Sequence, residues 1–241
     1  MGMPVTLEII DPNASIELLE AVFAYFETID AQFSTYKDNS EISLINRHEL
    51  TLEDASADMK TVFEMADQLR LKTDGYFDIQ HAGAYDPSGL VKGWAIFNAA
   101  EMIRQKGMTN FYVDAGGDIQ AAGKNNQGQA WRVGIRNPFK LDEIVKVLSI
   151  SGCGVATSGA YVRGAHIYNP KNLIEPITDI VSLTVIGPDV YDADCYATAA
   201  FAMGKEGINF IQGLVGFEGY MIDRNRRATF TSGFSRYVIH A

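Results

Sequence analysis

Apolar residues recur at helical spacing in four stretches of the chain. In the first, Ile16, Leu19, Val22 and Phe26 would share one face of a helix, and Ser15 precedes them at the N-cap position. Similar spacing predicts helices near residues 54–71, 91–107 and 192–203. Each apolar stripe is most simply explained as a face that packs against a core.

Short runs rich in β-branched and aromatic residues predict strands in the remaining chain. We expect strands near residues 4–10, 111–113, 119–122, 131–135, 145–150, 180–186 and within 219–240, with a hairpin loop at 124–129. Helices and strands do not alternate strictly, which favours an α+β fold over a doubly wound sheet. No repeat or linker is visible, so we predict one domain over residues 1–241, with a mixed or antiparallel sheet core flanked by helices.

Composition narrows the class of protein. The chain has 241 residues, of which 47% are hydrophobic and 21% charged, so a disordered or collagenous chain is excluded. The formal net charge of -10 argues against a nucleic-acid partner, which normally meets a basic surface. Two cysteines, Cys153 and Cys195, form no disulfide framework and are expected to be small core residues.

The chain carries no visible targeting segment. Residues 1–4 lack the charged and apolar regions of a signal peptide, and no apolar run approaches the ~18 residues of a membrane span. We therefore expect a soluble protein with no transmembrane segment of its own. A cytoplasmic location is expected for the sequence as written, or an exported one if a signal peptide has been removed ahead of Met1.

Common catalytic motifs are missing. Residues 152–157 begin like a dinucleotide fingerprint but carry Thr157 where its last glycine would stand. The sequence has no P-loop, no zinc-protease motif and no nucleophile elbow around Ser158. Its four histidines are too scattered to suggest a zinc site.

Four segments nevertheless hold more polar and glycine residues than packing requires. Around Ser40 the simplest interpretation is a second helix N-cap. In the second segment, a turn at residues 86–89 leads into a helix with Lys92 in its first turn, where a phosphate contact and a solvated lysine both fit. The third joins the glycine pair Gly116-Gly117 to a hydroxyl-rich turn at 157–158 and to His166, and either a phosphate site or a capped turn would explain it.

The fourth segment suggests a metal ligand pair. Asp194 and Thr198 are four residues apart, so on a helix both oxygens would point the same way. Hard oxygen ligands of this kind suit Mg²⁺ better than a soft metal. A plain helix with an aspartate N-cap explains the same residues without a ligand.

Taken in order, the motifs resemble the FAD:protein FMN transferases, the ApbE-like flavin transferases. The resemblance covers nearly the whole chain and rests on residues 34–46, 75–78, 88–94, 116–119, 156–159, 166–170 and 193–198. Each motif is short, but seven in the same order are highly specific.

The resemblance implies that FAD is the substrate and Mg²⁺ the cofactor. It assigns the Mg²⁺ ligands to the side chains of Asp194 and Thr198 and the carbonyl group of Gly89. It places Lys92 beside the pyrophosphate and makes His166 the proton acceptor. The remaining residues expected along the FAD pocket are Met1, Tyr36, Tyr76, Phe77, Asp78, Asp86, Thr157, Ser158 and Ile167.

The implied reaction is Mg²⁺-dependent transfer of FMN from FAD to a Thr or Ser hydroxyl of an acceptor protein, with release of AMP. The expected acceptor is a membrane redox subunit or a flavin-carrying domain. Hydrolysis of FAD to FMN and AMP, and flavin binding without turnover, are the alternatives. Two departures from the family pattern matter: the stretch between Asp78 and Asp86 is short, and Ala197 stands where some relatives carry an aspartate.

Overall fold

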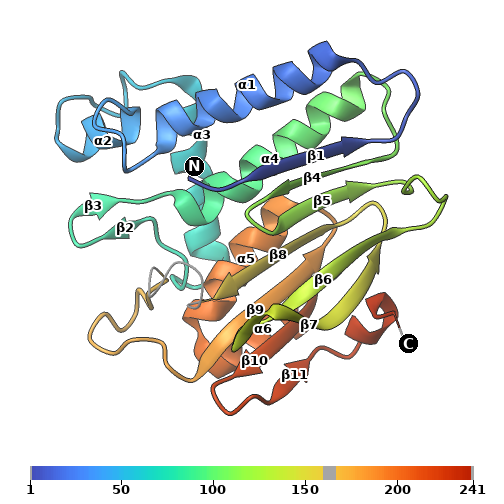
Figure 1. Cartoon of the computed structure of the whole chain (residues 1–241). Coiled ribbons are helices and arrows are strands. Elements are labelled where there is room, and N and C mark those ends of the chain that lie inside the picture. The colour runs from blue at the N-terminus through green and yellow to red at the C-terminus, as the bar shows by residue number, and fades with distance from the viewer. Residues whose placement is uncertain (1, 160–166, 240–241) are drawn as a thin grey trace.

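The computed structural model describes residues 2–159 and 167–239, and its main element is a seven-stranded sheet (Figure 1). Its strand order is β1-β4-β5-β8-β9-β10-β11, and all of its strand pairs are antiparallel. The strands are β1 (Val5–Ile9), β4 (Phe111–Ala115), β5 (Asp118–Ala122), β8 (Gly154–Gly159), β9 (Ile180–Gly187), β10 (Glu218–Asp223) and β11 (Ala228–Phe230). This confirms the α+β prediction.

Helices cover one face of this sheet. The longest are α1 (Ile16–Phe33), α3 (Ala57–Lys72), α4 (Ser88–Gln105) and α5 (Val190–Ala202); α2 (Glu41–Asn46), α6 (Gly207–Gln212) and the 3₁₀ turns Gly204–Glu206 and Phe234–Tyr237 are short. Both α4 and α5 pack on central strands, β4 and β5 for α4, β8 and β9 for α5. None of the helices in the described ranges combines the length and apolarity that a membrane span requires.

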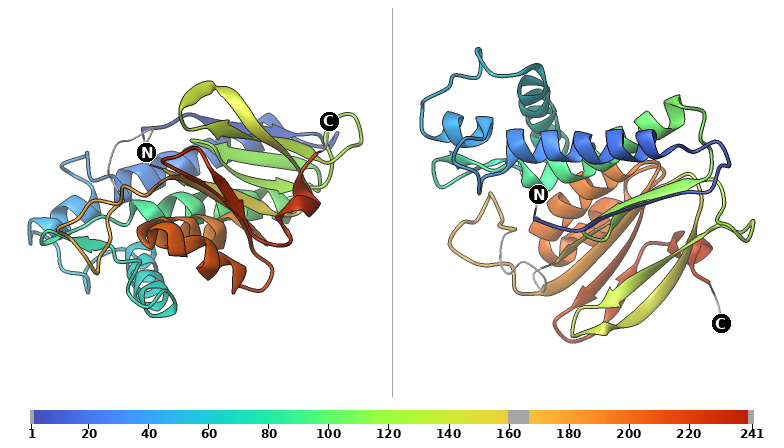
Figure 2. Two further views of the ribbon diagram at one scale, coloured as in Figure 1. Left: turned by 90° about the horizontal axis from the view of Figure 1, so that it is seen from below. Right: turned by 45° about the horizontal axis from the view of Figure 1, so that its top comes forward.

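A separate hairpin covers the opposite face of the sheet. Strands β6 (Trp131–Asn137) and β7 (Lys140–Ile150) pair with each other as a sheet of their own and lie across the main sheet (Figures 1 and 2). Alternation along β6 explains the packing, because Trp131, Val133 and Ile135 are buried while Arg132 and Arg136 are exposed. The buried side joins one apolar cluster with Val155 and other sheet residues.

Local sequence signals set several helix ends. The hydroxyl groups of Ser15, Ser40 and Ser56 accept backbone N–H groups at the starts of α1, α2 and α3. For α5 the N-cap is Asp189, earlier than the sequence suggested, and its side chain accepts the N–H of Asp192. Both cysteines are free and buried, as expected.

Three local predictions were wrong. The loop at 124–129 joins β5 to β6, which lie in different sheets, so it is not a hairpin loop. Helix α4 begins at Ser88, because the Asp86 carboxylate accepts the Ser88 N–H and the Pro87 carbonyl accepts the N–H groups of Leu90 and Val91. Lys92 therefore lies in the second turn of the helix rather than the first. Thr157 belongs to strand β8 rather than to a turn, since β8 pairs with β9 along its whole length. Hydroxyl-rich β8 lacks the apolar alternation by which a buried strand is recognised.

The shortened stretch after Asp78 forms a small hairpin. Strands β2 (Gln80–His81) and β3 (Ala84–Tyr85) pair around Ala82 and Gly83, both of which have positive φ. The Asn46 side chain binds the Tyr85 backbone at both its N–H and its carbonyl, which ties this hairpin to α2. One domain over residues 1–241 stays a prediction.

Candidate active site

A cleft of about 690 Å³ opens where the start of α4 meets the ends of several strands. Its lining comes from the beginning of the chain, the 76–78 turn, α4, β4, β5, β6, β8, α5 and the segment after residue 166. The cleft therefore gathers residues from most of the chain. The two segments that face each other across its floor are α4 and α5.

Lys92 lies at the centre of the cleft between two carboxylates. Its ammonium group forms an ion pair with Asp118 on β5, and its Nζ lies 3.3 Å from Oδ1 of Asp194 on α5. The Lys92 side chain is only 16% exposed and both carboxylates are 2% exposed, so water screens these charges little. Among residues 2–159 and 167–239, one cation thus compensates two buried carboxylates in part, which leaves this group with an excess of negative charge.

Asp194 shows the effect of that excess. Burial raises its pKa to about 7, and the Lys92 charge opposes this rise while Asp118 adds to it. The other carboxylate oxygen, Oδ2, accepts the Gly93 backbone N–H at 2.9 Å. The Asp194 carboxylate is therefore already oriented, and its negative charge is only partly compensated, which favours binding of a second cation.

Gly93 allows the two helices to approach this closely. A Cβ atom at this position would lie 2.7 Å from Cβ of Asp194 and 2.9 Å from the carbonyl oxygen of Val190. Such distances are too short for real carbon contacts. The glycine is thus required by the packing that brings Lys92 and Asp194 together.

Gly89, one turn before Gly93 on α4, meets Thr198, one turn after Asp194 on α5. A Cβ atom on Gly89 would lie 3.2 Å from Cγ2 of Thr198 and 3.5 Å from its hydroxyl oxygen. The Thr198 hydroxyl also lies 3.4 Å from the hydroxyl of Ser158. Carboxylate, hydroxyl and carbonyl oxygens therefore line this part of the cleft, which is the ligand chemistry that suits Mg²⁺. Residues 2–159 and 167–239 contain no cluster of three or more His, Cys, Asp or Glu side chains that would form a metal site alone.

Asp118 connects the cleft to the sheet. Its Oδ1 accepts the Thr157 backbone N–H at 2.9 Å, while the Thr157 hydroxyl lies 2.8 Å from that of Thr184 on β9. A residue that holds both β8 and Lys92 fixes the lysine relative to the hydroxyl groups of β8. Asp118 belongs to the 116–119 motif, but sequence reasoning assigned it no role in the site.

The 76–78 turn forms one wall of the cleft. The Tyr168 hydroxyl donates to the carbonyl oxygen of Asp78 at 2.6 Å, and burial raises the pKa of this tyrosine well above its usual range. Nζ of Lys171 lies 4.3 Å from the centre of the Tyr76 ring and pairs with Asp74. These contacts attach the turn to the segment that follows residue 166.

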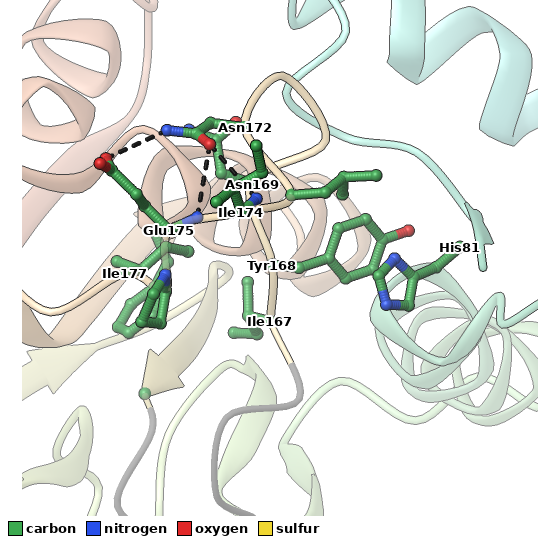
Figure 3. Close-up of a pocket in the computed structure, with 12 residues that line it drawn as sticks. His81, Ile167, Tyr168, Asn169, Asn172, Ile174, Glu175 and Ile177 are labelled. Atoms are coloured by element: carbon green, nitrogen blue, oxygen red, sulfur yellow. Dashed lines mark hydrogen bonds between the residues drawn. The ribbon is translucent and has the colours of Figure 1, made fainter.

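A smaller cavity of about 220 Å³ adjoins the cleft and shares Gly159, Ile167 and Tyr168 with it. The His81 ring stacks on Tyr168 with the ring centres 4.0 Å apart (Figure 3). On the other side, the Asn172 side chain donates to the Glu175 carboxylate and accepts backbone N–H groups (Figure 3). The β2–β3 hairpin thereby contacts the segment that borders the cleft.

Most of the site residues expected from the sequence line the cleft. They are Tyr76, Phe77, Asp78, Asp86, Gly89, Lys92, Thr157, Ser158, Ile167, Asp194 and Thr198. Tyr36 does not line it, and 97% of its side chain is exposed. Met1 and His166 lie outside the described residues. The roles given to all of these residues stay predictions.

Asp114 and Arg136 also line the cleft, although sequence reasoning assigned neither of them a role. Asp114 at the end of β4 has a pKa raised by burial and by Asp118, and the charge of Arg136 on β6 opposes that rise. Arg136 follows the buried Ile135 in an alternating strand, so the pattern indicated only that it faces outward. Its position beside the cleft depends on how the hairpin crosses the sheet.

The ApbE family model matches residues 1–85 and 80–221 of the chain. A protein of Escherichia coli K12 named FAD:protein FMN transferase is 30% identical over 148 residues, which are 58% of this chain and 42% of that protein. A protein of the same name from Haemophilus influenzae is 25% identical over 78% of this chain and 72% of its own length. The chain thus matches less than half of the length of the Escherichia coli relative.

Solved structures have the same fold. The structure described as flavin transferase ApbE from Vibrio cholerae superposes with a TM-score of 0.84 at 24% identity and covers 98% of this chain and 96% of its own. The ApbE protein of Thermotoga maritima gives a TM-score of 0.82 at 21% identity. At these identities the likeness establishes the fold.

Proposed function

The chain belongs to the ApbE family, and on that premise we propose that it is an Mg²⁺-dependent FAD:protein FMN transferase. It moves FMN from FAD to a Thr or Ser hydroxyl of an acceptor protein and releases AMP. The observation that carries the proposal is the buried group formed by Lys92, Asp118 and Asp194 beside the hydroxyls of Ser158 and Thr198. A cleft with this combination suits a pyrophosphate together with a divalent cation.

The reaction requires one bond to form and one to break. The acceptor oxygen bonds to the FMN-side phosphorus, the bond from this phosphorus to the AMP oxygen breaks, and AMP leaves with that electron pair. The hydroxyl proton passes to a base, the role we assign to His166. Lys92 holds positive charge beside the pyrophosphate, where it offsets charge that develops on the departing AMP.

Asp194, Thr198 and the Gly89 carbonyl would hold Mg²⁺. When bound, the ion would supply charge neutralisation on the pyrophosphate. Asp194 is prepared for this role because Gly93 orients it, and its buried charge is only partly compensated. Thr198 presents its hydroxyl from the same face of α5, one turn later.

The remaining predicted residues would bind FAD. Tyr76, Phe77 and Asp78 offer ring surface and polar groups from one wall, and Ile167 offers apolar surface from the segment that the wall contacts. The Asp86 carboxylate already accepts the Ser88 N–H, so it would contact FAD with its other oxygen. Met1 and Tyr36 were expected in the same set; Tyr36 lies outside the cleft lining and Met1 outside the described residues, so neither carries the proposal.

The alternatives use the same cleft. With water in place of the acceptor hydroxyl, the protein would be an Mg²⁺-dependent FAD pyrophosphatase, and with too weak a metal site it would only bind flavin. The second alternative rested on Ala197, but this side chain is fully buried in an apolar cluster with Ala156 and Leu183 and does not line the cleft. We therefore favour an enzyme.

One incubation separates the three functions. The protein is mixed with FAD, Mg²⁺ and a small acceptor domain that carries an exposed Thr, and the acceptor is analysed by mass spectrometry while nucleotides are separated by chromatography. An acceptor heavier by one FMN, together with released AMP, supports transfer. Free FMN with AMP and an unmodified acceptor would favour hydrolysis, and intact FAD would leave only binding.

The location and the physiological acceptor are separate proposals. We propose a cytoplasmic protein, or an exported one if a signal peptide precedes this sequence, and fractionation of the source cells would distinguish the two locations. For the acceptor we propose a membrane redox subunit or a flavin-carrying domain. A covalently bound flavin on such a protein that disappears when this protein is deleted would support that assignment.

A further inference from the structure

The turn between β10 and β11 exposes three arginines within four residues, Arg224, Arg226 and Arg227. The adjacent Asp223 carboxylate is buried and accepts the N–H groups of Asn225 and Arg227 at 2.8 and 2.9 Å. Its charge is therefore used to shape the turn. Throughout the described ranges, no carboxylate lies within 4.0 Å of the three guanidinium groups.

Arg226 occupies an unfavourable backbone conformation. Its φ of 64° lies in the left-handed region, where glycine carries no steric penalty and a long side chain does. Its guanidinium lies 5.1 Å from the centre of the Phe139 ring at the tip of the β6–β7 hairpin. An arginine therefore occupies this position although glycine would adopt the same backbone conformation without strain.

Strand registers place this turn at the same end of the sheet as Gly159 of the cleft. Gly159, which lines the cleft, pairs with Ser182 on β9, and Ser182 pairs with Ile222 on β10, the residue before Asp223. Neighbouring strands lie about 4.8 Å apart, so the turn begins roughly 10 Å from Gly159. Both further views show the hairpin tip beside the β10–β11 turn (Figure 2).

The hairpin tip continues the basic surface to the cleft itself. Arg136 lines the cleft. Phe139 follows it three residues later at the hairpin tip, is 41% exposed and contacts Arg226 of the turn. We call Arg136, Phe139, Arg224, Arg226 and Arg227 the arginine rim. Arginine and aromatic side chains are the residue types most often decisive in protein interfaces.

We propose that the arginine rim docks the acceptor protein through acidic residues that flank its target hydroxyl. The proposal rests on the proposed function, because only an acceptor must bring a side chain to the mouth of this cleft. The chain carries a net charge of -10, so a partner that is anionic over a wide area, such as nucleic acid or an anionic membrane, would be repelled by most of the molecule. A protein with a local acidic patch gains the attraction without that repulsion.

Synthetic peptides test the rim without a known acceptor. Three fluorescein-labelled peptides share one central Thr, which is flanked by Glu in the first, Gln in the second and Lys in the third. We expect the Glu peptide to bind at least tenfold more tightly than the Gln peptide at low salt, by fluorescence anisotropy, and salt to weaken only the Glu peptide's binding. Equal affinity for the Glu and Gln peptides would overturn the proposal.

Two charge-reversed variants locate the effect. The variant R224E/R226E/R227E should lose the preference for Glu while its affinity for FAD is unchanged. The control K60E/K106E/K124E makes the same change of charge at exposed positions away from the cleft and should keep the preference. Loss in both variants, or in neither, would contradict the assignment, as would tighter binding to phosphatidylserine vesicles than to the Glu peptide.

A single substitution separates folding from docking. Arg226→Gly should raise the melting temperature, because it relieves the positive φ, yet weaken binding of the Glu peptide two- to threefold. An unchanged affinity in this variant would count against the rim. Mass spectrometry of the same peptides after incubation with FAD and Mg²⁺ tests the proposed function separately. Binding of the Glu peptide without its modification would refute FMN transfer, while the docking result would still stand.

Discussion

The Lys92 ammonium and the Asp118 carboxylate form a buried ion pair between α4 and β5. Because Asp118 also accepts the Thr157 N–H, the pair ties a helix, its own strand and β8 to one point. Loss of one partner leaves a buried charge with less compensation, which costs more than loss of a surface ion pair.

Asp118→Ala is expected to lower the free energy of unfolding by about 1–3 kcal/mol, because it removes the buried acceptor of the Thr157 N–H and one of the two carboxylates that contact Lys92. Urea denaturation measures this change. Asp118→Asn is the matched control, because the amide oxygen can still accept the Thr157 N–H. Equal free energies of unfolding for the alanine variant and the unmodified protein would show that the ion pair does not stabilise the fold.

Asp194→Ala should abolish Mg²⁺-dependent release of AMP from FAD. The substitution removes a proposed metal ligand and the acceptor of the Gly93 N–H. Calorimetric titration with Mg²⁺ and a nucleotide assay measure the two effects, with circular dichroism as a check of folding. Asp192→Asn on the same helix, outside the cleft lining, is the control, and undiminished turnover in Asp194→Ala would refute the metal assignment.

Gly93→Ala should destabilise the protein by about 1–3 kcal/mol, the usual cost of overpacking. The added methyl group would meet Cβ of Asp194 at 2.7 Å, so α4 and α5 must separate. Thermal or urea unfolding, together with FAD affinity, measures the outcome. Gln105→Ala at the exposed end of α4 controls for helix propensity, and a similar stability of both variants would mean that the helices accommodate the methyl group.

His166→Ala should bind FAD normally and transfer FMN about 10²-fold more slowly, the lower end of what a general base contributes. Single-turnover rates at several pH values measure the effect, and the variant should lose the rise in rate that accompanies deprotonation of the histidine. His81→Ala, which removes the ring stacked on Tyr168, is the control. A full rate in His166→Ala would remove this residue from the base role.

Tyr25 makes the stability depend on pH in the alkaline range. Burial raises the pKa of Tyr25 from 10.0 to about 12, although a hydrogen bond from Asn98 on α4 opposes the rise. Between these values the unfolded chain has lost this proton and the folded chain has kept it, so the free energy of unfolding falls as pH increases. The total change is about 2–3 kcal/mol.

In Tyr25→Phe the free energy of unfolding should no longer fall between pH 10 and about 12, the interval between the two pKa values. Urea denaturation at several pH values across this interval measures the change. Tyr36→Phe is the control, because the Tyr36 ring is 97% exposed and its replacement should leave the slope unchanged. The same slope in all three proteins would contradict a buried, hydrogen-bonded Tyr25.

By itself the sequence determined the elements whose signals are local. Helical spacing of apolar residues places α1 and α3, and the caps Ser15 and Ser40 mark the starts of α1 and α2, because both signals act within a few residues of chain. The position of Asp194 and Thr198 on one face of α5 followed from the helical repeat alone. The ordered motifs supplied the family and most of the residues that line the cleft.

Only the tertiary structure decided which charges meet. The ion pair of Lys92 with Asp118, the placement of Thr157 on a strand and the position of Arg136 beside the cleft all depend on how α4, β8 and the β6–β7 hairpin pack. Such contacts join residues far apart in the chain, and no local propensity encodes them. The arginine rim is of the same kind, since it exists only because two turns meet at one end of the sheet.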